Sequence, residues 1–370
     1  MRASSRAAVL EEFGRDVAVR EYDVPGPEPG AVVAGVDYGG VCGTDVHLRH
    51  GRLPIPIPVV LGHEAVGRVE ALGDGVGRDA LGRPLAEGDR VGWASSIACN
   101  RCYYCLIEQA RTLCTDRVVY GINQSADEWP HLSGGWADAI YLRPRTTVVR
   151  IPDDVSSEQV IALGCAGPTV THGMARLGPI PAGGVVAVQG SGPVGLAAAM
   201  TARLRGAGTV VVLGAPANRL RLATELGVAD VVVDITDVTD PAERLERVLP
   251  ETEGGRGADV VVEATGDPGA VAEGVDMCRP NGRYLVLGQY TDQGSTPINP
   301  HRLVAKQLAL TTAWGFDASD YVAFLRSLPE LAARFDLTRL VSVYPLQRAN
   351  DALSDVAAGA VTKAALAPTD

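Results

Sequence analysis

From residue 156 onward the chain repeats one pattern: a short, continuous apolar run followed by a segment with helical periodicity. Strands that are buried on both faces have such runs, and in a parallel sheet they alternate with helices. The pattern therefore predicts an α/β fold with a doubly wound parallel sheet. The apolar runs are 185–188, 210–213, 231–233, 260–262, 284–287 and 308–312, and two of the helical segments are 196–205 and 219–226.

The first apolar run leads into a glycine-rich turn. Residues 190–195, GSGPVG, have the spacing G-x-G-x-x-G and open the next helical segment. In dinucleotide-binding proteins such glycines allow a tight turn, approach of the pyrophosphate and close helix packing. An ordinary strand-to-helix turn is the alternative, but the sheet pattern that follows favours dinucleotide binding. The residues expected to bind the cofactor here are Gly190, Gly192, Pro193, Val194 and Gly195.

The position that selects between NAD and NADP departs from the usual pattern. An acidic side chain is expected about 20 residues after such a turn, where it binds the ribose hydroxyls of NAD. Gly214 stands there instead, which weakens discrimination against NADP. Recognition of a 2′-phosphate also has little support, because Pro216 lacks an N–H and the nearest guanidinium, that of Arg219, is on the next helix. We therefore expect NAD(P), with NAD slightly favoured.

The first 150 residues predict an irregular β-rich domain. Short β-like runs at 32–36, 65–72, 90–93 and 147–151 are separated by turns rich in glycine and proline. Near the other end, a helical stretch at 321–335 precedes a short β-like segment. A chain that leaves the parallel sheet in this way can return to the first domain, which would make the β-rich domain discontinuous.

Composition and charge exclude several classes of function. Hydrophobic residues make up 46% of the chain, which is enough for substantial cores and excludes disorder. The net charge of -11, without long runs of one sign, argues against nucleic acid as a partner. The longest apolar stretches fall short of the roughly 20 residues that span a bilayer, and the start lacks an apolar signal core. We expect a cytoplasmic protein with reduced cysteines and no membrane partner.

Four of the seven cysteines form one cluster. Cys99, Cys102, Cys105 and Cys114 have the spacing C-x2-C-x2-C-x8-C, which can bring four thiolates around one ion. A redox dithiol would leave two of them unexplained. An iron–sulfur cluster also accepts four thiolates, so the spacing favours structural zinc and leaves iron–sulfur as the alternative. A closed set of four ligands braces a loop and has no open position for chemistry.

A second set of residues could form an open metal site. A catalytic zinc takes about three protein ligands and leaves a position for water or substrate. Cys42 and His63 are two candidates, and Cys165, at the junction of the two expected domains, is the third. Taken singly, a cysteine or histidine is more often a buried core residue. The dinucleotide motif downstream favours the catalytic interpretation, because metal-polarised alcohols and nicotinamide are chemically paired.

Together these motifs closely resemble the zinc-containing alcohol dehydrogenases of the medium-chain dehydrogenase/reductase superfamily, nearly from end to end. The resemblance includes the open site with residues 62–64 (GHE), residues 88–91 (GDRV), the four-cysteine lobe, the sequence around Cys165, the glycine-rich turn and residues 262–266 (VEATG). It implies a GroES-like catalytic domain, residues 1–165 and 305–370, with a zinc lobe at about 99–114. A Rossmann domain, residues 166–304, is inserted between these parts.

The resemblance also implies the metals and their ligands. It identifies the lobe metal as zinc, so we expect two zinc ions per chain, one catalytic and one structural. Cys42, His63 and Cys165 should bind the catalytic ion, and Glu64 should lie beside it, where it can enter or leave the ligand shell. Asp45 should accept a hydrogen bond from the His63 ring nitrogen that does not bind the metal. The family forms dimers and tetramers, so a homodimer or homotetramer is expected.

The mechanism that the family implies begins with zinc, which polarises the alcohol oxygen. The Thr44 hydroxyl takes the proton and passes it through the cofactor ribose to His47 and solvent, while a hydride moves to the nicotinamide. Thr169 should lie by the nicotinamide, and Thr265 is also expected to bind the cofactor. Taken by themselves, Thr44 could be a turn hydroxyl and His47 a surface imidazole.

Two other functions remain open. A polyol or amino-alcohol dehydrogenase of the same superfamily is the alternative enzyme, although many polyol enzymes have a carboxylate where Cys165 stands. A non-catalytic protein that binds zinc and dinucleotide is the more remote alternative, since every ligand position of the open site is filled. The small-molecule substrate cannot be derived from the sequence, although residues 120–136, Trp93 and Trp314 are expected around its pocket.

Overall fold

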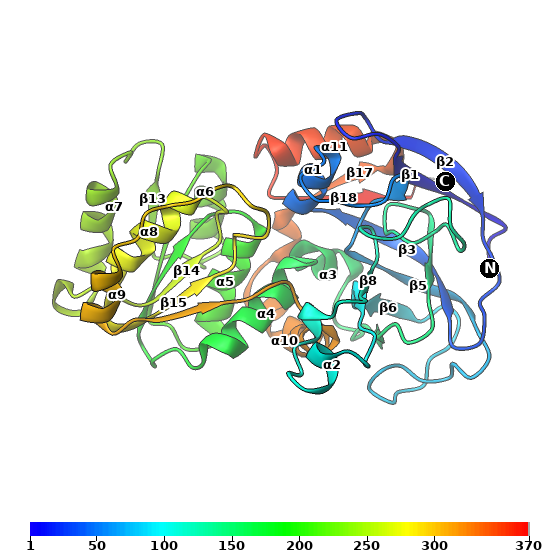
Figure 1. The fold of residues 1–370 in the computed structure, drawn as a ribbon, viewed down its shortest axis with the longest axis horizontal. Coiled ribbons are helices and arrows are strands. Elements are labelled where there is room, and N and C mark those ends of the chain that lie inside the picture. The colour runs from blue at the N-terminus through cyan, green and yellow to red at the C-terminus, as the bar shows by residue number, and fades with distance from the viewer. Residues whose placement is uncertain (369–370) are drawn as a thin grey trace. The chain divides into compact units, whose positions relative to one another are not determined.

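The computed structural model describes residues 1–368, and the chain divides into two compact units (Figure 1). Unit 1 comprises residues 1–165, 317–329 and the chain from 337 onward, and unit 2 comprises 166–316 and 330–336. Unit 1 is therefore built from three separate stretches of sequence. Within the described residues, no helix combines the length and the apolar character needed to cross a membrane.

Unit 2 contains a six-stranded parallel sheet in the order β13-β12-β11-β14-β15-β16. The chain order reverses between β11 and β14, as it does in the doubly wound dinucleotide-binding fold. Each of the six apolar runs forms a strand, which confirms the expected fold class. The strands are β11 (Val185–Gln189), β12 (Thr209–Gly214), β13 (Val231–Asp234), β14 (Ala258–Glu263), β15 (Cys278–Val286) and β16 (Ala309–Thr312).

Short polar residues and prolines start several helices of unit 2. The side chains of Asp240, Asp267 and Asn299 each accept a hydrogen bond from a backbone N–H in the first turn, and a proline follows each of them. A proline in that position leaves no donor unsatisfied and has the backbone angle that a helix needs. The helices are α4 (Ala166–Leu177), α5 (Pro193–Leu204), α6 (Ala217–Glu225), α7 (Pro241–Val248), α8 (Pro268–Met277) and α9 (Pro300–Lys306).

The end of unit 2 lies later in the chain than the sequence indicated. The sequence predicts that the catalytic domain resumes at residue 305, but residues 305–316 and 330–336 belong to unit 2. The reason is β16, whose backbone pairs with β15 from Ala309 to Thr312 and so completes the sheet. Cys278 is the buried first residue of β15.

Unit 1 is β-rich and contains a seven-stranded sheet in the order β10-β6-β5-β3-β18-β17, with β9 also paired to β3. The last strand of the chain, β18, lies antiparallel to β3, so the end of the chain completes a sheet that its start begins. Its strands are β3 (Val32–Val41), β5 (Ala65–Leu72), β6 (Arg90–Trp93), β9 (Ala139–Leu142), β10 (Val148–Arg150), β17 (Val341–Pro345) and β18 (Lys363–Ala367).

Smaller elements complete unit 1. A three-stranded sheet contains β1 (Ser4–Leu10), β2 (Ala18–Asp23) and β4 (Val59–Val60), and a two-stranded sheet contains β7 (Ser96–Ile97) and β8 (Val118–Val119). The helices are α1 (Gly43–Arg49), α2 (Tyr103–Leu106), α3 (Ser157–Leu163), α10 (Ala318–Arg334), whose last residues lie in unit 2, and α11 (Ala349–Ala357). One core cluster joins Leu48 of α1, Leu353 of α11 and Leu366 of β18, which holds α1 against the end of the chain.

Candidate functional site

The four cysteines of the lobe come together around α2 and the turn after it. Their sulfur atoms all lie within 4.8 Å of one another. The Sγ–Sγ distance is 3.5 Å between Cys102 and Cys105, and 4.0 Å between Cys99 and Cys105. A tetrahedral site with Zn–S bonds of ~2.3 Å places its sulfurs about 3.8 Å apart. The arrangement therefore fits one zinc ion.

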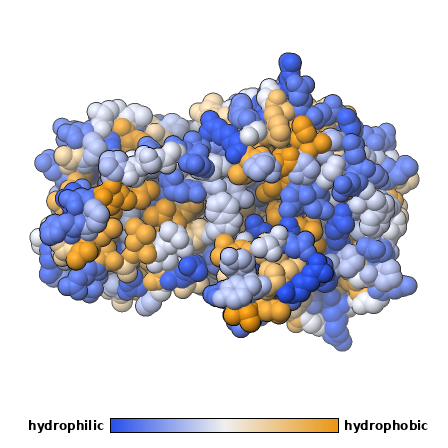
Figure 2. Space-filling model, viewed as in Figure 1, coloured by the Kyte–Doolittle hydropathy of each residue, from blue (hydrophilic) through white to orange (hydrophobic). Residues whose placement is uncertain are grey.

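The lobe has almost no apolar core of its own. Its buried cluster consists of Cys99, Cys105 and Cys114, whereas Leu106 and Ile107 are 59% and 67% exposed. Figure 2 shows hydrophobic residues on the molecular surface in the region of α2. Backbone N–H groups point at the sulfurs, and that of Thr115 lowers the pKa of Cys102 to about 6. A segment without apolar packing needs a bound metal to hold its shape.

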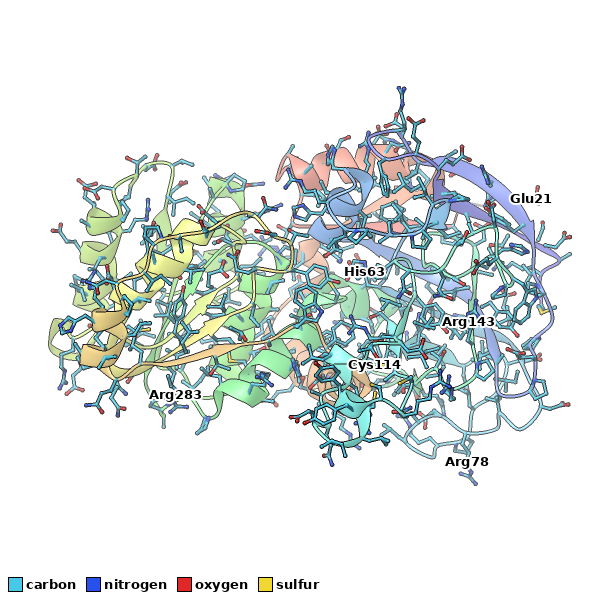
Figure 3. All side chains as sticks on the ribbon, in the orientation of Figure 1. Glu21, His63, Arg78, Cys114, Arg143 and Arg283 are labelled. Atoms are coloured by element: carbon cyan, nitrogen blue, oxygen red, sulfur yellow. The ribbon has the colours of Figure 1, made fainter. Side chains whose placement is uncertain are left out.

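The second cluster brings Cys42, His63, Glu64 and Cys165 together within unit 1. Cys42 follows β3 and caps the start of α1, His63 and Glu64 follow β4, and Cys165 follows α3. One ligand atom from each lies within 4.8 Å of the others, and the two sulfurs are 3.4 Å apart. Figure 3 labels His63 from this cluster and Cys114 from the lobe. Two thiols, an imidazole and a neighbouring carboxylate form a donor set that suits zinc.

Asp45 orients the imidazole of this cluster. Its carboxylate is fully buried, lies 3.3 Å from Nδ1 of His63 and accepts a hydrogen bond of 2.8 Å from the backbone N–H of Cys42. Burial opposes protonation of His63, but the charge of Asp45 outweighs it and raises the pKa of His63. Because Nδ1 is held by Asp45, Nε2 is the nitrogen left for a metal.

The thiols of Cys42 and Cys165 interact directly. The hydrogen bond from Cys165 lowers the pKa of Cys42, whereas the same contact raises the pKa of Cys165. Cysteines bind a metal as thiolates, so the lowered pKa of Cys42 favours metal binding, and binding at Cys165 would release its proton.

Glu64 is held in place by a lysine that the sequence analysis missed. Lys363, the first residue of β18, is 2% exposed and forms an ion pair with the Glu64 carboxylate, which also accepts a hydrogen bond from the backbone N–H of Cys165. A Cβ at Gly40 or at Gly164 would lie 2.7 or 1.9 Å from atoms of Glu64, so the two glycines leave the space that the carboxylate fills. A single lysine in an otherwise apolar strand was the signal available in the sequence, since a buried charge requires a partner.

The two residues expected to relay a proton lie on α1. Thr44 Oγ1 is 3.8 Å from Cys42 Sγ, and both Thr44 and His47 are half-buried. Residues three positions apart are neighbours on a helix surface, so both side chains leave α1 on the same side. Nδ1 of His47 is 3.4 Å from the Arg52 guanidinium. Burial, together with the charge of Arg52, lowers the pKa of His47, which favours the neutral imidazole that can accept a proton.

In unit 2, the glycine-rich turn has the shape that a phosphate requires. A Cβ at Gly195 would lie 1.9 Å from the carbonyl oxygen of Gly190, so only glycine allows α5 to pack so close to β11. A Cβ at Gly192 would meet only the Arg219 guanidinium, 4.0 Å away. Gly192 begins α5 without a side-chain cap, and Pro193 and Val194 follow as its first residues. The free N–H groups of α5 can therefore bind an anion.

Gly214 has a structural reason to lack a side chain. A Cβ there would lie 2.6 Å from Oγ and 2.8 Å from the backbone nitrogen of Ser191. Ser191 is itself buried and donates a hydrogen bond of 3.0 Å to the carbonyl oxygen of Ala215. A single substitution of Gly214 by aspartate would thus not fit without a backbone shift, and the acidic residue of the usual pattern is sterically excluded.

Three further residues that the sequence predicts near the cofactor or the substrate are Thr265, Thr169 and Trp136. The hydroxyl of Thr265 donates to Glu263 at 2.7 Å and accepts from the backbone N–H of Asp267 at 2.9 Å, so it is already used within its own loop. Thr169 is half-buried in the first turn of α4. Trp136, expected near the substrate, is fully buried, and its Nε1 donates to the carbonyl oxygen of Gly40. Trp136 is therefore a core residue.

Comparisons with known proteins find dehydrogenase relatives over nearly the whole chain. Two family descriptions match: an alcohol dehydrogenase GroES-like domain over residues 28–153 and a zinc-binding dehydrogenase over residues 193–330. A 5-exo-hydroxycamphor dehydrogenase from Pseudomonas putida is 36% identical over 97% of this chain and 97% of its own length. A sorbitol dehydrogenase from Halalkalibacterium halodurans is 30% identical, over 95% and 96%. The crystal structure of an alcohol dehydrogenase from Thermotoga maritima is 34% identical and superimposes with a TM-score of 0.93, covering 99% of this chain and 100% of that one.

The Lys363–Glu64 pair predicts a stability effect. Lys363→Met leaves the Glu64 carboxylate buried without its cation, so it should lower the free energy of unfolding by about 3–5 kcal/mol, measured by urea denaturation. The double variant Lys363→Met with Glu64→Gln removes both charges and should lose less than the single variant. A Lys363→Met protein as stable as the wild type would contradict this account of the pair.

Proposed function

The chain belongs to the zinc-containing alcohol dehydrogenase family of the medium-chain dehydrogenase/reductase superfamily and is an oxidoreductase of CH–OH groups, and from this premise we propose that it depends on zinc and NAD(P). The observation that carries the proposal is the cluster of Cys42, His63, Glu64 and Cys165, in a chain that also has the glycine-rich turn. The reaction is the transfer of a hydride between an alcohol and the nicotinamide, which interconverts alcohol and carbonyl compound. Because every ligand position of the open site is filled, a non-catalytic role is disfavoured.

Four side chains of unit 1 have separate roles in the proposed reaction. When bound here, zinc would supply Lewis-acid polarisation of the substrate oxygen, and the dinucleotide would accept the hydride. Asp45 holds the tautomer and orientation of His63, and Lys363 holds the carboxylate of Glu64. The Thr44 hydroxyl takes the proton of the alcohol, and neutral His47 accepts it at the solvent end. Thr44 would release its own hydroxyl proton as it accepts that of the alcohol, and His47 would deliver a proton to solvent.

For the cofactor we propose NAD(P), with NAD slightly favoured. The proposed contacts are those of Gly190, Gly192, Pro193, Val194 and Gly195 with the pyrophosphate, together with Gly214, Arg219, Thr169 and, through its backbone carbonyl, Thr265. Ser191 fills the space beside Gly214, so a carboxylate that would repel a 2′-phosphate cannot stand there. This contact supports weak discrimination between NAD and NADP. A 28% identical zinc-binding dehydrogenase from Sinorhizobium meliloti was crystallised with NADP, which supports use of either cofactor.

The substrate is proposed as a small alcohol. Relatives are named for hydroxycamphor, sorbitol and threonine, which supports the CH–OH group and leaves a polyol or amino alcohol as the alternative substrate. Cys165, where many polyol enzymes have a carboxylate, favours a simple alcohol. The 36% identity to the hydroxycamphor enzyme, against 30% to the sorbitol enzyme, points the same way.

We also propose a homodimer or homotetramer in the cytoplasm, with neither nucleic acid nor membrane as a partner. β16 is an edge strand of its sheet, and Leu310 on it and Val304 on α9 are 44% and 74% exposed. An edge strand with exposed apolar side chains is suited to pairing with a second copy. Six of the seven cysteines lie in the two metal-ligand clusters and none is in a disulfide, which supports a compartment that keeps thiols reduced.

The proposed reaction predicts alcohol-dependent reduction of a nicotinamide cofactor. Purified protein should reduce NAD, and NADP less well, with at least one member of a panel of primary, secondary and polyhydric alcohols, measured by absorbance of the reduced cofactor. We expect the ratio of kcat/KM for the two cofactors to stay below about 100-fold, because residue 214 has no carboxylate to repel a 2′-phosphate. A chelator that removes the metal should abolish the reaction. Turnover that survives complete loss of zinc would refute the proposal.

The two cysteine clusters predict two zinc ions with separable roles. Metal analysis of the wild type should find two zinc ions per chain. Cys42→Ala should retain the lobe zinc and the fold but lose turnover, whereas Cys102→Ala should lose the lobe zinc and chiefly lower the melting temperature. One zinc ion per wild-type chain, or normal turnover of Cys42→Ala, contradicts the assignment. Iron in the lobe would favour the iron–sulfur alternative.

The proposed relay predicts a rate effect at Thr44. A proton-transfer group contributes roughly 10²–10⁴-fold, so Thr44→Val should lower kcat for alcohol oxidation by about that factor while cofactor affinity is retained. Thr44→Ser keeps the hydroxyl and serves as the matched control. His47→Ala should cost less, because water can replace an imidazole at the solvent end. If Thr44→Val oxidises alcohols at the wild-type rate across the pH range, Thr44 has no part in the mechanism.

A further inference from the structure

Glu263, at the end of β14, is a buried carboxylate that the proposed mechanism does not use. Its side chain is 0% exposed, although ionised carboxylates are rarely buried without compensation. We propose that Glu263 is a positioning residue for the nicotinamide half of the cofactor, because it joins the loops that follow β14 and β15. The inference rests on the proposed binding of NAD(P) by unit 2.

The hydrogen bonds of this carboxylate link two separate loops. Oε1 accepts from the backbone N–H and the hydroxyl of Thr265, at 2.6 and 2.7 Å, and from the N–H of Gly266 at 2.9 Å. Oε2 accepts from the N–H of Gly288 at 3.1 Å. All these donors belong to the segments just after β14 and β15. One side chain therefore satisfies backbone groups at the ends of two neighbouring strands.

The two loops are also packed too closely to tolerate side chains. A Cβ at Gly288 would lie 2.4 Å from the backbone nitrogen of Gly266 and 2.6 Å from Oε1 of Glu263. The backbone of β14 adds a further link, because the N–H of Leu287 donates to the carbonyl oxygen of Glu263 at 2.9 Å. The junction formed by Glu263, Gly266 and Gly288 is thus fixed by contacts that a neutral or shorter side chain could not reproduce.

The position of this junction connects it to the cofactor. In doubly wound sheets the dinucleotide lies across the carboxyl ends of the strands where the strand order reverses, and each half of the sheet binds one mononucleotide. The order reverses between β11 and β14. The loop after β14 lies against the glycine-rich turn, because the N–H of Ala264 donates to the carbonyl oxygen of Gln189 at 2.8 Å and a Cβ at Gly190 would lie 2.7 Å from the carbonyl oxygen of Ala264. The loop after β15 lies farther into the half of the sheet that serves the nucleoside with the nicotinamide. The bond from Gly288 to Oε2 of Glu263 therefore ties the nicotinamide loop to the part of the sheet that holds the turn. Glu263 sets the spacing of those loops.

A matched control exists on the same strand. Asp259, at the amino end of β14, accepts a hydrogen bond of 2.8 Å from the backbone N–H of Val185 and pairs with Arg279 at 2.7 Å. Like Glu263, it accepts a hydrogen bond from the backbone and links two strands. It lies at the amino ends of the strands, whereas the cofactor of a doubly wound sheet binds at their carboxyl ends. Substitution of either residue by its amide removes one charge and one acceptor. A difference between the two variants therefore reports position and not general stability.

The experiment compares the dissociation constants of two ligands, each measured by calorimetry: the reduced cofactor that the wild type binds more tightly, and ADP, which represents the adenosine half. In Glu263→Gln an amide N–H₂ faces backbone donors, so the affinity for the whole cofactor should fall about 10-fold, as expected for loss of one charge-assisted hydrogen bond. The affinity for ADP should stay within about twofold, because the amide oxygen can still accept from Thr265 and Gly266 beside the glycine-rich turn, whereas the amide nitrogen faces the N–H of Gly288. Asp259→Asn should lower the melting temperature and leave both affinities unchanged.

Each other result overturns the inference in a recognisable way. Equal losses for cofactor and ADP, or the same pattern in Asp259→Asn, would show that Glu263 only stabilises the fold. Wild-type cofactor affinity in Glu263→Gln would show that the junction does not reach the nicotinamide. If Glu263→Gln does not fold, Glu263→Asp, which keeps the charge but cannot span both loops, must show the same selective loss. A wild-type protein that binds neither ligand overturns the proposed function as well.

Discussion

The open site of unit 1 depends on a buried ion pair between two distant parts of the chain. Lys363 lies on the last strand, β18, and Glu64 lies in the loop after β4, yet both are nearly inaccessible to solvent. Glu64 in turn accepts the backbone N–H of Cys165, and β18 pairs with the strand that leads to Cys42. The positions of the candidate metal ligands are thus coupled to the end of the chain. A buried charge is costly unless paired, so neither residue can change alone.

In unit 2, too, acidic side chains hold separate segments of the chain together. Carboxylates at the two ends of β14, the partly exposed Asp259 and the buried Glu263, accept hydrogen bonds from backbone N–H groups of neighbouring segments. Glycines complete the arrangement where backbones approach too closely for a Cβ, as at Gly195 against Gly190 and at Gly214 against Ser191. Polar satisfaction and close approach together determine where the loops at the carboxyl ends of the strands lie.

Several sequence inferences were incomplete because they treated residues one at a time. Gly214 was understood as the loss of a ribose ligand, whereas its contact with Ser191 shows that the space for a side chain is absent. Thr265 was expected to bind the cofactor, but its hydroxyl is engaged by Glu263 and Asp267. The predicted domain boundary at residue 305 was wrong because β16 pairs with β15. A short apolar run in the sequence does not show which strand it will pair with.

The sequence by itself determined the alternation that produces the parallel sheet, the glycine-rich turn and the two sets of metal-ligand residues. These are local signals, since hydrophobic periodicity, turn chemistry and ligand spacing depend on neighbours in the chain. Only the tertiary structure decided that Lys363 pairs with Glu64 and that Glu263 bridges two loops. Such partners are separated by tens to hundreds of residues, and the free energy that selects them comes from burial. A buried charge takes whichever partner the fold brings within hydrogen-bond distance, and spacing in the sequence cannot reveal which one that is.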